Sequence, residues 1–157
     1  MLKEYQNINT IITDASCFIL FDKIGCIHIL EDLYGEVITT PEIAAEYGKQ
    51  LPGWVQVQPV KNRNLFNTYA EMVDTGEASA IALAYEVISP SLILDDLKGR
   101  NLAEKLRLPY TGSIGVLILA RQRGVITLLQ PYFEKIKTTD FRIPASLLQT
   151  LSNIYDN

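Results

Sequence analysis

The chain alternates short runs of apolar and β-branched residues with longer segments in which apolar positions recur every three or four residues. The short runs predict strands, and the longer segments predict helices. Strands are expected at 8–13, 36–40, 54–60 and 91–95, with a last short strand or loop at 108–113. Helices are expected at 15–25, 26–35, 41–50, 62–88 (interrupted at 74–76), 98–108, 114–124, 125–137 and 143–155.

Glycine and proline mark the ends of several of these segments. Gly25 and Gly35 follow the first two helical segments, in the position that favours glycine at a helix C-terminus. Pro41 stands in the first turn of the next helix, where its missing N–H costs no hydrogen bond. Pro59 cannot donate to a neighbouring strand, so we expect the run that contains it to be an edge strand.

Strands that alternate with helices form right-handed βαβ units and parallel sheets. We therefore predict a three-layer α/β/α fold with a central parallel sheet of four to five strands. No linker, repeat or change of composition divides the sequence. Residues 1–157 are thus expected to form one domain, in which residues 146–157 are a docking helix.

Composition narrows the class of protein. The 157 residues include 18 acidic and 14 basic ones, which gives a formal net charge of −4. An acidic balance excludes a uniformly basic surface of the kind that binds nucleic acid without specificity. Cys17 and Cys26 stand among apolar residues and are expected to be buried thiols. The N-terminus lacks a signal-peptide pattern and no apolar run is long enough to cross a membrane, so we expect a cytoplasmic protein without membrane contact.

Acidic residues follow the two most apolar strands. Asp14 ends the first, and Asp95 and Asp96 end the strand at 91–95. Ligands of open parallel sheets bind at the carboxyl ends of the strands, where the strand order reverses. Carboxylates gathered there repel one another unless a cation neutralises them, and oxygen ligands without Cys or His favour Mg²⁺ or Mn²⁺. Adjacent residues of an extended strand face opposite ways, so we expect at most one of the two adjacent aspartates to be a direct ligand, unless the loop turns between them.

Two glutamates are placed to reach the same edge. Glu46 lies in the helix that starts at Pro41, and Glu77 opens a helix of small residues that can approach the sheet closely. The alternative is structural, because acids at helix N-termini cap the helix or interact with its dipole. Taken singly, Asp14, Glu77 and Asp96 fit a cap as well as a metal ligand. Glu42 fits the first-turn acid better than a site residue.

The order of the motifs ITDAS, TPEIAAEY, GEASAIALA and LILDD, followed by KGRNLAEKLRL and LPYTGSIGVLILARQRG, resembles the PIN-domain family over residues 8–145. Within that family it is most similar to an uncharacterised bacterial and archaeal branch with a Gly-Glu and Asp-Asp pattern. The resemblance implies an α/β fold with a central parallel sheet and a metal-dependent nuclease. Its acidic positions correspond here to Asp14, Glu46, Glu77, Asp95 and Asp96.

The resemblance further implies hydrolysis of single-stranded RNA with Mg²⁺ or Mn²⁺ and, as in many PIN domains, a toxin held by an antitoxin protein. No side-chain nucleophile is needed, which agrees with the single histidine. Lys98, Arg100 and Arg107 are candidates for phosphate contacts. Ser113 is a candidate substrate contact, although it and Thr111 also fit a cap of the helix at 114–123. The apolar positions of the last helix and the aromatic pair Tyr132-Phe133 are candidates for the contact surface of a homodimer.

Two alternatives compete with the nuclease. Toxin-type members usually carry Asp where this chain has Glu77, and often a Thr-containing turn where it has Asp95-Asp96. A catalytically degenerate member that binds nucleic acid or protein is therefore the main alternative. A phospho-acceptor receiver domain would need a lysine after the last strand, and LPYTGS has none. Setting aside the five candidate site acids leaves 13 acidic against 14 basic residues, so the overall charge does not oppose a polyanionic substrate.

Overall fold

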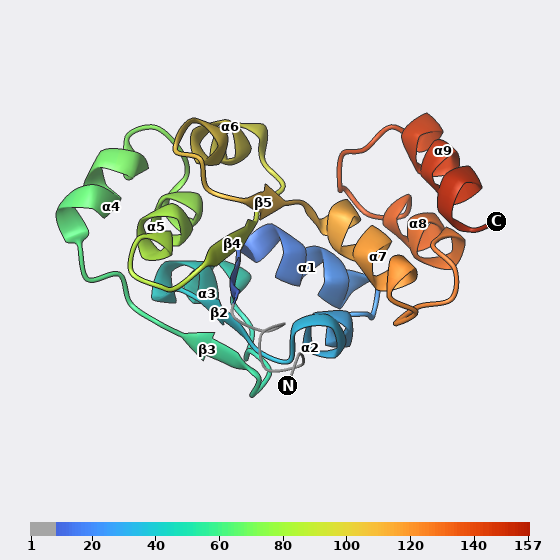
Figure 1. Ribbon diagram of the computed structural model, residues 1–157, viewed down its shortest axis with the longest axis horizontal. Coiled ribbons are helices and arrows are strands. Elements are labelled where there is room, and N and C mark those ends of the chain that lie inside the picture. Colours follow the sequence, from blue (N-terminus) through green and yellow to red (C-terminus); the bar gives the residue numbers. More distant parts are fainter. Residues whose placement is uncertain (1–8) are drawn as a thin grey trace.

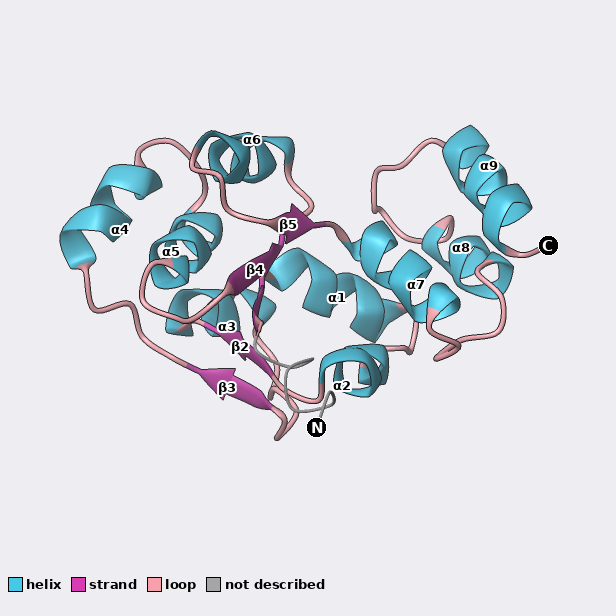
Figure 2. Cartoon of the chain, viewed as in Figure 1, coloured by secondary structure: helices cyan, strands magenta, loops and turns pink. Residues whose placement is uncertain are grey.

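The computed structural model describes residues 9–157 and shows one parallel sheet covered by helices (Figures 1 and 2). The five strands of the described chain follow the order β3-β2-β1-β4-β5, and every neighbouring pair is parallel. Their bounds are β1 Thr10–Thr13, β2 Val37–Thr39, β3 Val55–Val57, β4 Pro90–Ile93 and β5 Tyr110–Thr111. The predicted parallel sheet is confirmed, and β3 occupies an edge as expected, although the strand ends at Val57, before Pro59.

Strand order reverses between the two central strands. From β1 the chain moves outward through β2 to β3, then returns across the sheet to β4 and continues to β5 on the other side. β1 and β4 are in register, with Thr13 opposite Ile93. The carboxyl ends of both strands therefore meet at one edge of the sheet, at the reversal point where parallel sheets bind ligands.

Nine helices of the described chain complete a three-layer α/β/α architecture (Figure 2). Most begin and end within a few residues of the predicted limits. Their bounds are α1 Ala15–Lys23, α2 His28–Tyr34, α3 Pro41–Tyr47, α4 Arg63–Ala70, α5 Thr75–Ala84, α6 Leu97–Lys105, α7 Ser113–Gln122, α8 Gln130–Ile136 and α9 Ala145–Tyr155. Gly25 and Gly35 follow α1 and α2 with φ of 74°, a conformation that side chains with a Cβ disfavour.

Helix α5 is the most deeply buried helix in residues 9–157. Every residue from Gly76 to Ala84 is buried, and the helix contacts α3, α4 and α6 as well as the two central strands. Alanine, glycine and serine at most of these positions let the neighbours approach on all sides. The first turn of α5 consequently enters the protein at Gly76, near the carboxyl ends of β1 and β4, while Asp74 and Thr75 are exposed.

The C-terminal helices differ in part from the prediction. The helix expected at 125–137 begins only at Gln130, and Pro131 lies in its first turn. The preceding residues form an irregular segment that nevertheless buries Ile126 and Leu129. Asp156 accepts hydrogen bonds from the backbone N–H groups of Leu129 (2.7 Å) and Gln130 (2.9 Å), so the end of α9 caps α8. No helix in residues 9–157 has the length and apolar character that crossing a bilayer requires.

Candidate metal centre

Three aspartates occupy N-cap positions at the carboxyl edge of the sheet. Asp14 precedes α1, Asp74 precedes α5 and Asp96 precedes α6. None of the three side chains accepts the hydrogen bond that an N-cap normally takes from the first turn. By contrast, Thr40 and Asn62 cap α3 and α4 through their side chains. Capping therefore does not account for these aspartates, although each still lies at the helix N-terminus that the dipole makes favourable for a negative charge.

The carboxylates converge around the first turn of α5. Oxygen atoms of Asp74, Glu77 and Asp96 all lie within 4.8 Å of one another. On the other side of the turn, a Cβ added to Gly76 would stand 2.8 Å from Oε2 of Glu46 and 3.3 Å from Oδ1 of Asp14. We call the five acids Asp14, Glu46, Asp74, Glu77 and Asp96 the acidic site.

Buried oxygens of the acidic site lack partners. Asp14 is 6% exposed and Glu77 3%, and neither Oδ1 of Asp14 nor either carboxylate oxygen of Glu77 has a hydrogen-bond partner. A buried polar atom without a partner costs about 1–3 kcal/mol, and more when it is charged. Native proteins keep such atoms where a ligand satisfies them, and a divalent cation fits oxygens in this arrangement.

Burial and mutual repulsion hold these carboxyls closer to the neutral form. Burial is the main reason that the pKa of Asp14 rises from 3.8 to about 7; the backbone N–H of Ala15 lowers it, and the negative charge of Glu46 raises it. Burial likewise raises the pKa of Glu77 from 4.5 to about 8, with further contributions from Asp14 and Asp96. A bound cation would reverse both shifts, because it favours the ionised form.

Asp95 has a different role from Asp96. Its carboxylate accepts hydrogen bonds from Oγ of Ser16 (2.8 Å) and from the backbone N–H (2.7 Å) and Oγ (2.6 Å) of Ser113. These bonds join the end of β4 to the starts of α1 and α7. Asp95 thus fixes the turn from which Asp96 faces Glu77, and the two adjacent aspartates do diverge.

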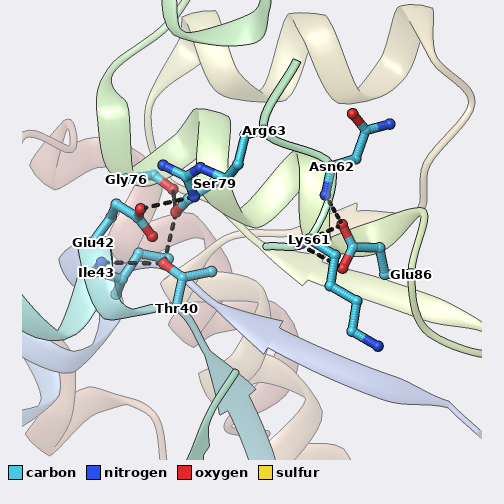
Figure 3. Close-up of polar contacts among 9 residues, drawn as sticks. All are labelled: Thr40, Glu42, Ile43, Lys61, Asn62, Arg63, Gly76, Ser79 and Glu86. Atoms are coloured by element: carbon cyan, nitrogen blue, oxygen red, sulfur yellow. Dashed lines mark hydrogen bonds and ion pairs between the residues drawn. The ribbon is translucent and has the colours of Figure 1, made fainter. Parts of the chain in front are cut away.

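A chain of buried hydroxyls fixes the first turn of α5 against α3 (Figure 3). Oγ of Ser79 donates to the carbonyl oxygen of Gly76 at 2.6 Å and lies 2.6 Å from Oγ1 of Thr40. Because the Ser79 proton is already used, Thr40 donates to Ser79, and Thr40 accepts in turn from the backbone N–H of Ile43 at 3.2 Å. This chain sets the distance between α3, which carries Glu46, and the turn that carries Glu77.

Acids near α4 stabilise the surroundings of the acidic site without belonging to it. Glu42 is the first-turn acid of α3 and pairs with Arg63 at 3.2 Å. Glu86 accepts hydrogen bonds from the backbone N–H groups of Lys61 and Asn62, each at 3.0 Å from an oxygen (Figure 3). The expectation that Glu42 is not a site residue agrees with this pairing.

The residues expected to contact the substrate differ in their exposure to solvent. Lys98 is exposed in the first turn of α6, and Arg100 is half-buried with its guanidinium 5.3 Å from the ring centre of Tyr110. Ser113 is fully buried and bonded to Asp95, so in this structure it offers no surface to a substrate. The alternative that Thr111 or Ser113 caps this helix is wrong, because the N-cap of α7 is Gly112.

Arg107 lies outside the helix in which we expected it. Helix α6 ends at Lys105, and Arg107 has a φ of 59° in the turn that follows. It lines a hollow together with Ser89 and Pro90, at the start of β4. That is the opposite end of the strand from the acidic site, so the structure gives no support to a phosphate contact by Arg107 at this site, and the contact stays a prediction.

Asp74 is a site residue that the sequence patterns do not single out. It stands in a loop between two helices, where an aspartate is the commonest kind of cap, and it follows no strand. One signal is present, because Asp74 and Glu77 are three residues apart at a helix start. That spacing indicates a capping box first, and in the structure the Asp74 side chain does not accept the capping hydrogen bond of such a box.

Gly99 of α6 makes room for Glu77. A Cβ at this position would overlap Oε2 of Glu77. We expect Gly99→Ala to displace the Glu77 carboxylate and to lower metal-dependent cleavage about tenfold, while the helix itself gains up to about 1 kcal/mol from the better helix former. Cleavage rates and melting temperature measure the two effects. Gly53→Ala is the control, because a Cβ there meets no atom within 4 Å, and equal rates for both variants would contradict the assignment.

Comparison with known proteins agrees with this geometry. The sequence model of a family described as a PIN domain matches residues 10–155. No curated protein and no solved structure matches the chain. PIN domains are generally metal-dependent nucleases, and a cluster of acids that can hold a metal ion stands at the expected edge of the sheet. A match over nearly the whole length, with an all-parallel five-stranded sheet, shows that this chain belongs to the PIN-domain family.

Proposed function

We propose that the protein is an endoribonuclease that hydrolyses phosphodiester bonds of single-stranded RNA with Mg²⁺ or Mn²⁺. The observation that supports this most strongly is the set of buried, unpartnered oxygens on Asp14 and Glu77. Apolar groups of the same shape at these positions would remove the cost of the unpartnered oxygens. Their presence beside the carboxylates of Asp74 and Asp96 fits a site that binds a cation.

Asp14, Asp74, Glu77 and Asp96 are the residues that would hold the ion, with Glu46 at the exposed rim. A bound divalent ion lowers the pKa of a water molecule and stabilises the charge that develops on the leaving oxygen. Asp95 keeps the turn before α6 in place through Ser16 and Ser113.

Positive side chains of α6 supply the contacts to the substrate. Lys98 and Arg100 follow the acidic turn in the first turn of α6, and we expect them to bind phosphates of the substrate. The sequence contains a single histidine, His28, which begins α2 and is not one of the residues gathered at the acidic site. The reaction therefore relies on carboxylates and cations, and no side chain forms a covalent intermediate.

Cleavage of a labelled single-stranded RNA with Mn²⁺ tests the proposal. The wild type is expected to cleave it and to stop when EDTA is added, and Asp14→Asn is expected to lose at least about tenfold in rate, because an amide replaces an anionic oxygen ligand. Asp32→Asn, an exposed position on α2, is the matched control. Equal activity of the wild type and Asp14→Asn would refute the site, whereas metal binding without cleavage would favour the catalytically degenerate alternative.

Three further expectations belong to the same proposal. Two of them stay predictions: a toxin role with an antitoxin partner, and a homodimer. Light scattering of the purified chain alone tests the homodimer, and light scattering of the chain co-expressed with a candidate antitoxin tests the partner. The cytoplasmic location also stays a prediction. Cys17 and Cys26 are both free and buried, and free thiols of this kind support a reducing compartment.

A further inference from the structure

A cleft of about 420 Å³ opens next to the turn that follows β4, with Asp95 as its only carboxylate and none of the five acids of the acidic site in its lining. On one side it is lined by Arg100 of α6 and by the turn from β5 into α7, and on the other by residues 141–144 and Leu147 of α9. Figure 1 shows α6 and the segment that leads to α9 on either side of β5. Asp95 belongs to its lining, so the cleft begins one residue along the chain from Asp96.

The lining combines positive charge with apolar surface. It contains two guanidinium groups, Arg100 and Arg142, against the single carboxylate of Asp95. That carboxylate already accepts three hydrogen bonds. Within residues 9–157 neither guanidinium forms an ion pair. Two cations without ion-pair partners, lining a cleft that also contains the neighbour of Asp96, fit an anionic ligand that lies along the cleft.

Phe141 contributes an aromatic ring to the same cleft. It is half-buried against the core, next to the exposed Arg142. Ile114 and Ile143 are the apolar neighbours in the lining. Nucleic-acid bases of a single strand expose faces that stack on such rings, whereas the bases of a duplex are already stacked on one another.

We propose that this cleft binds the single strand beside the cleavage point, with Arg100 and Arg142 on its phosphates and Phe141 against a base. The proposal rests on the proposed nuclease function for its ligand, and it adds a binding path contributed by α6 and the segment before α9. It also explains why the acidic site can act on a polyanion despite the net charge of −4, since the cleft lining alone has an excess of one positive charge.

Binding of a fluorescein-labelled single-stranded RNA of about 12 nucleotides, followed by anisotropy in EDTA near pH 6, tests the path without cleavage. Arg100→Gln and Arg142→Gln are each expected to weaken binding about tenfold. Each should also reduce the slope of log K against log salt by about 0.7, the value for one lost phosphate contact on a single strand. Phe141→Leu is expected to weaken binding about tenfold with an unchanged slope, because stacking releases no counterions.

Arg123→Gln is the matched control, since Arg123 is exposed at the far end of α7 and carries the same charge. The proposed binding in the cleft would be overturned if Arg142→Gln bound the RNA as tightly as the wild type, or if Arg123→Gln weakened binding as much as the cleft variants do. It would also be overturned if the wild type did not bind the RNA. A reduced salt slope in Phe141→Leu would overturn the base contact. Binding through the cleft without cleavage in Mn²⁺ would leave the path standing and refute the nuclease function.

Discussion

Glu77→Gln is expected to lower Mn²⁺-dependent RNA cleavage at least about a hundredfold while it stabilises the metal-free protein at alkaline pH. Both carboxylate oxygens of Glu77 are buried without partners, beside Asp74 and Asp96. An amide cannot supply the anionic ligand, and a metal ion contributes several kcal/mol to transition-state stabilisation, at about 1.4 kcal/mol per tenfold in rate.

The stability effect of the same substitution has the opposite sign. The pKa of Glu77 is raised to about 8, so above that pH the folded protein carries a buried negative charge that the unfolded chain holds at no cost. Glutamine removes this charge, and the melting temperature in EDTA at pH 8.5 should rise by several degrees. At pH 5.5 Glu77 is protonated in the folded protein, although the unfolded chain is still mostly ionised, so the gain should be much smaller; it should disappear only below the unfolded pKa of 4.5.

Thermal melts of the two proteins at both pH values, together with cleavage rates, measure the pair of effects. Glu71→Gln is the matched control, because Glu71 is exposed at the end of α4. Should Glu77→Gln destabilise the metal-free protein equally at both pH values, Glu77 would be a structural residue. Retained cleavage in this variant would remove it from the metal centre.

The stability of the metal-free wild type is expected to fall as the pH rises from 5 to 8. The pKa of Asp14 is about 7 in the folded protein against 3.8, and that of Glu77 about 8 against 4.5. Between these limits the folded protein binds more protons than the unfolded chain, so the free energy of unfolding decreases with pH. Each group contributes up to about 1.4 kcal/mol per pH unit, and because the two share one site we expect a total of about 3 kcal/mol.

A loss of this size corresponds to about 6–12 °C in melting temperature for a protein of this length. Mn²⁺ binds the ionised carboxylates, so its stabilising effect should grow over the same pH range and reach about 2.7 kcal/mol at a hundredfold excess over its dissociation constant. Melting in EDTA and in Mn²⁺ across this range tests both statements. The Asp14→Asn/Glu77→Gln double variant should show a flat profile, and a wild-type profile that is equally flat would contradict the raised pKa values.

Much of the fold could be predicted because local sequence determines it. The β-branched runs around Ile12 and Ile93, the glycines after α1 and α2, and Pro41 at the start of α3 all act through backbone preferences within a few residues. The parallel sheet then follows from the alternation of strands with helices. The local pattern is less reliable in the C-terminal region. Ile126 and Leu129 have the spacing of a helix in the sequence, but in the structure they belong to an irregular segment that buries them.

Candidate acids can be recognised wherever they follow a predicted strand. Asp14, Asp95 and Asp96 are found in this way, because parallel strands bring their carboxyl ends to one edge. The same reasoning does not identify Asp74, because Asp74 follows a helix and not a strand. It also cannot separate an aspartate that caps from one that does not, because both occupy the same position in the sequence.

The sequence by itself determined the strand and helix order, the family and the edge of the sheet where the acids gather. The tertiary structure decided the roles at that edge. It bonded Asp95 to Ser16 and Ser113, left Glu77 buried without a partner, and brought Asp74 beside Asp96. Periodicity and caps report contacts within one or two turns, whereas these roles depend on contacts between residues about 20 to 80 positions apart, which chain folding alone brings together.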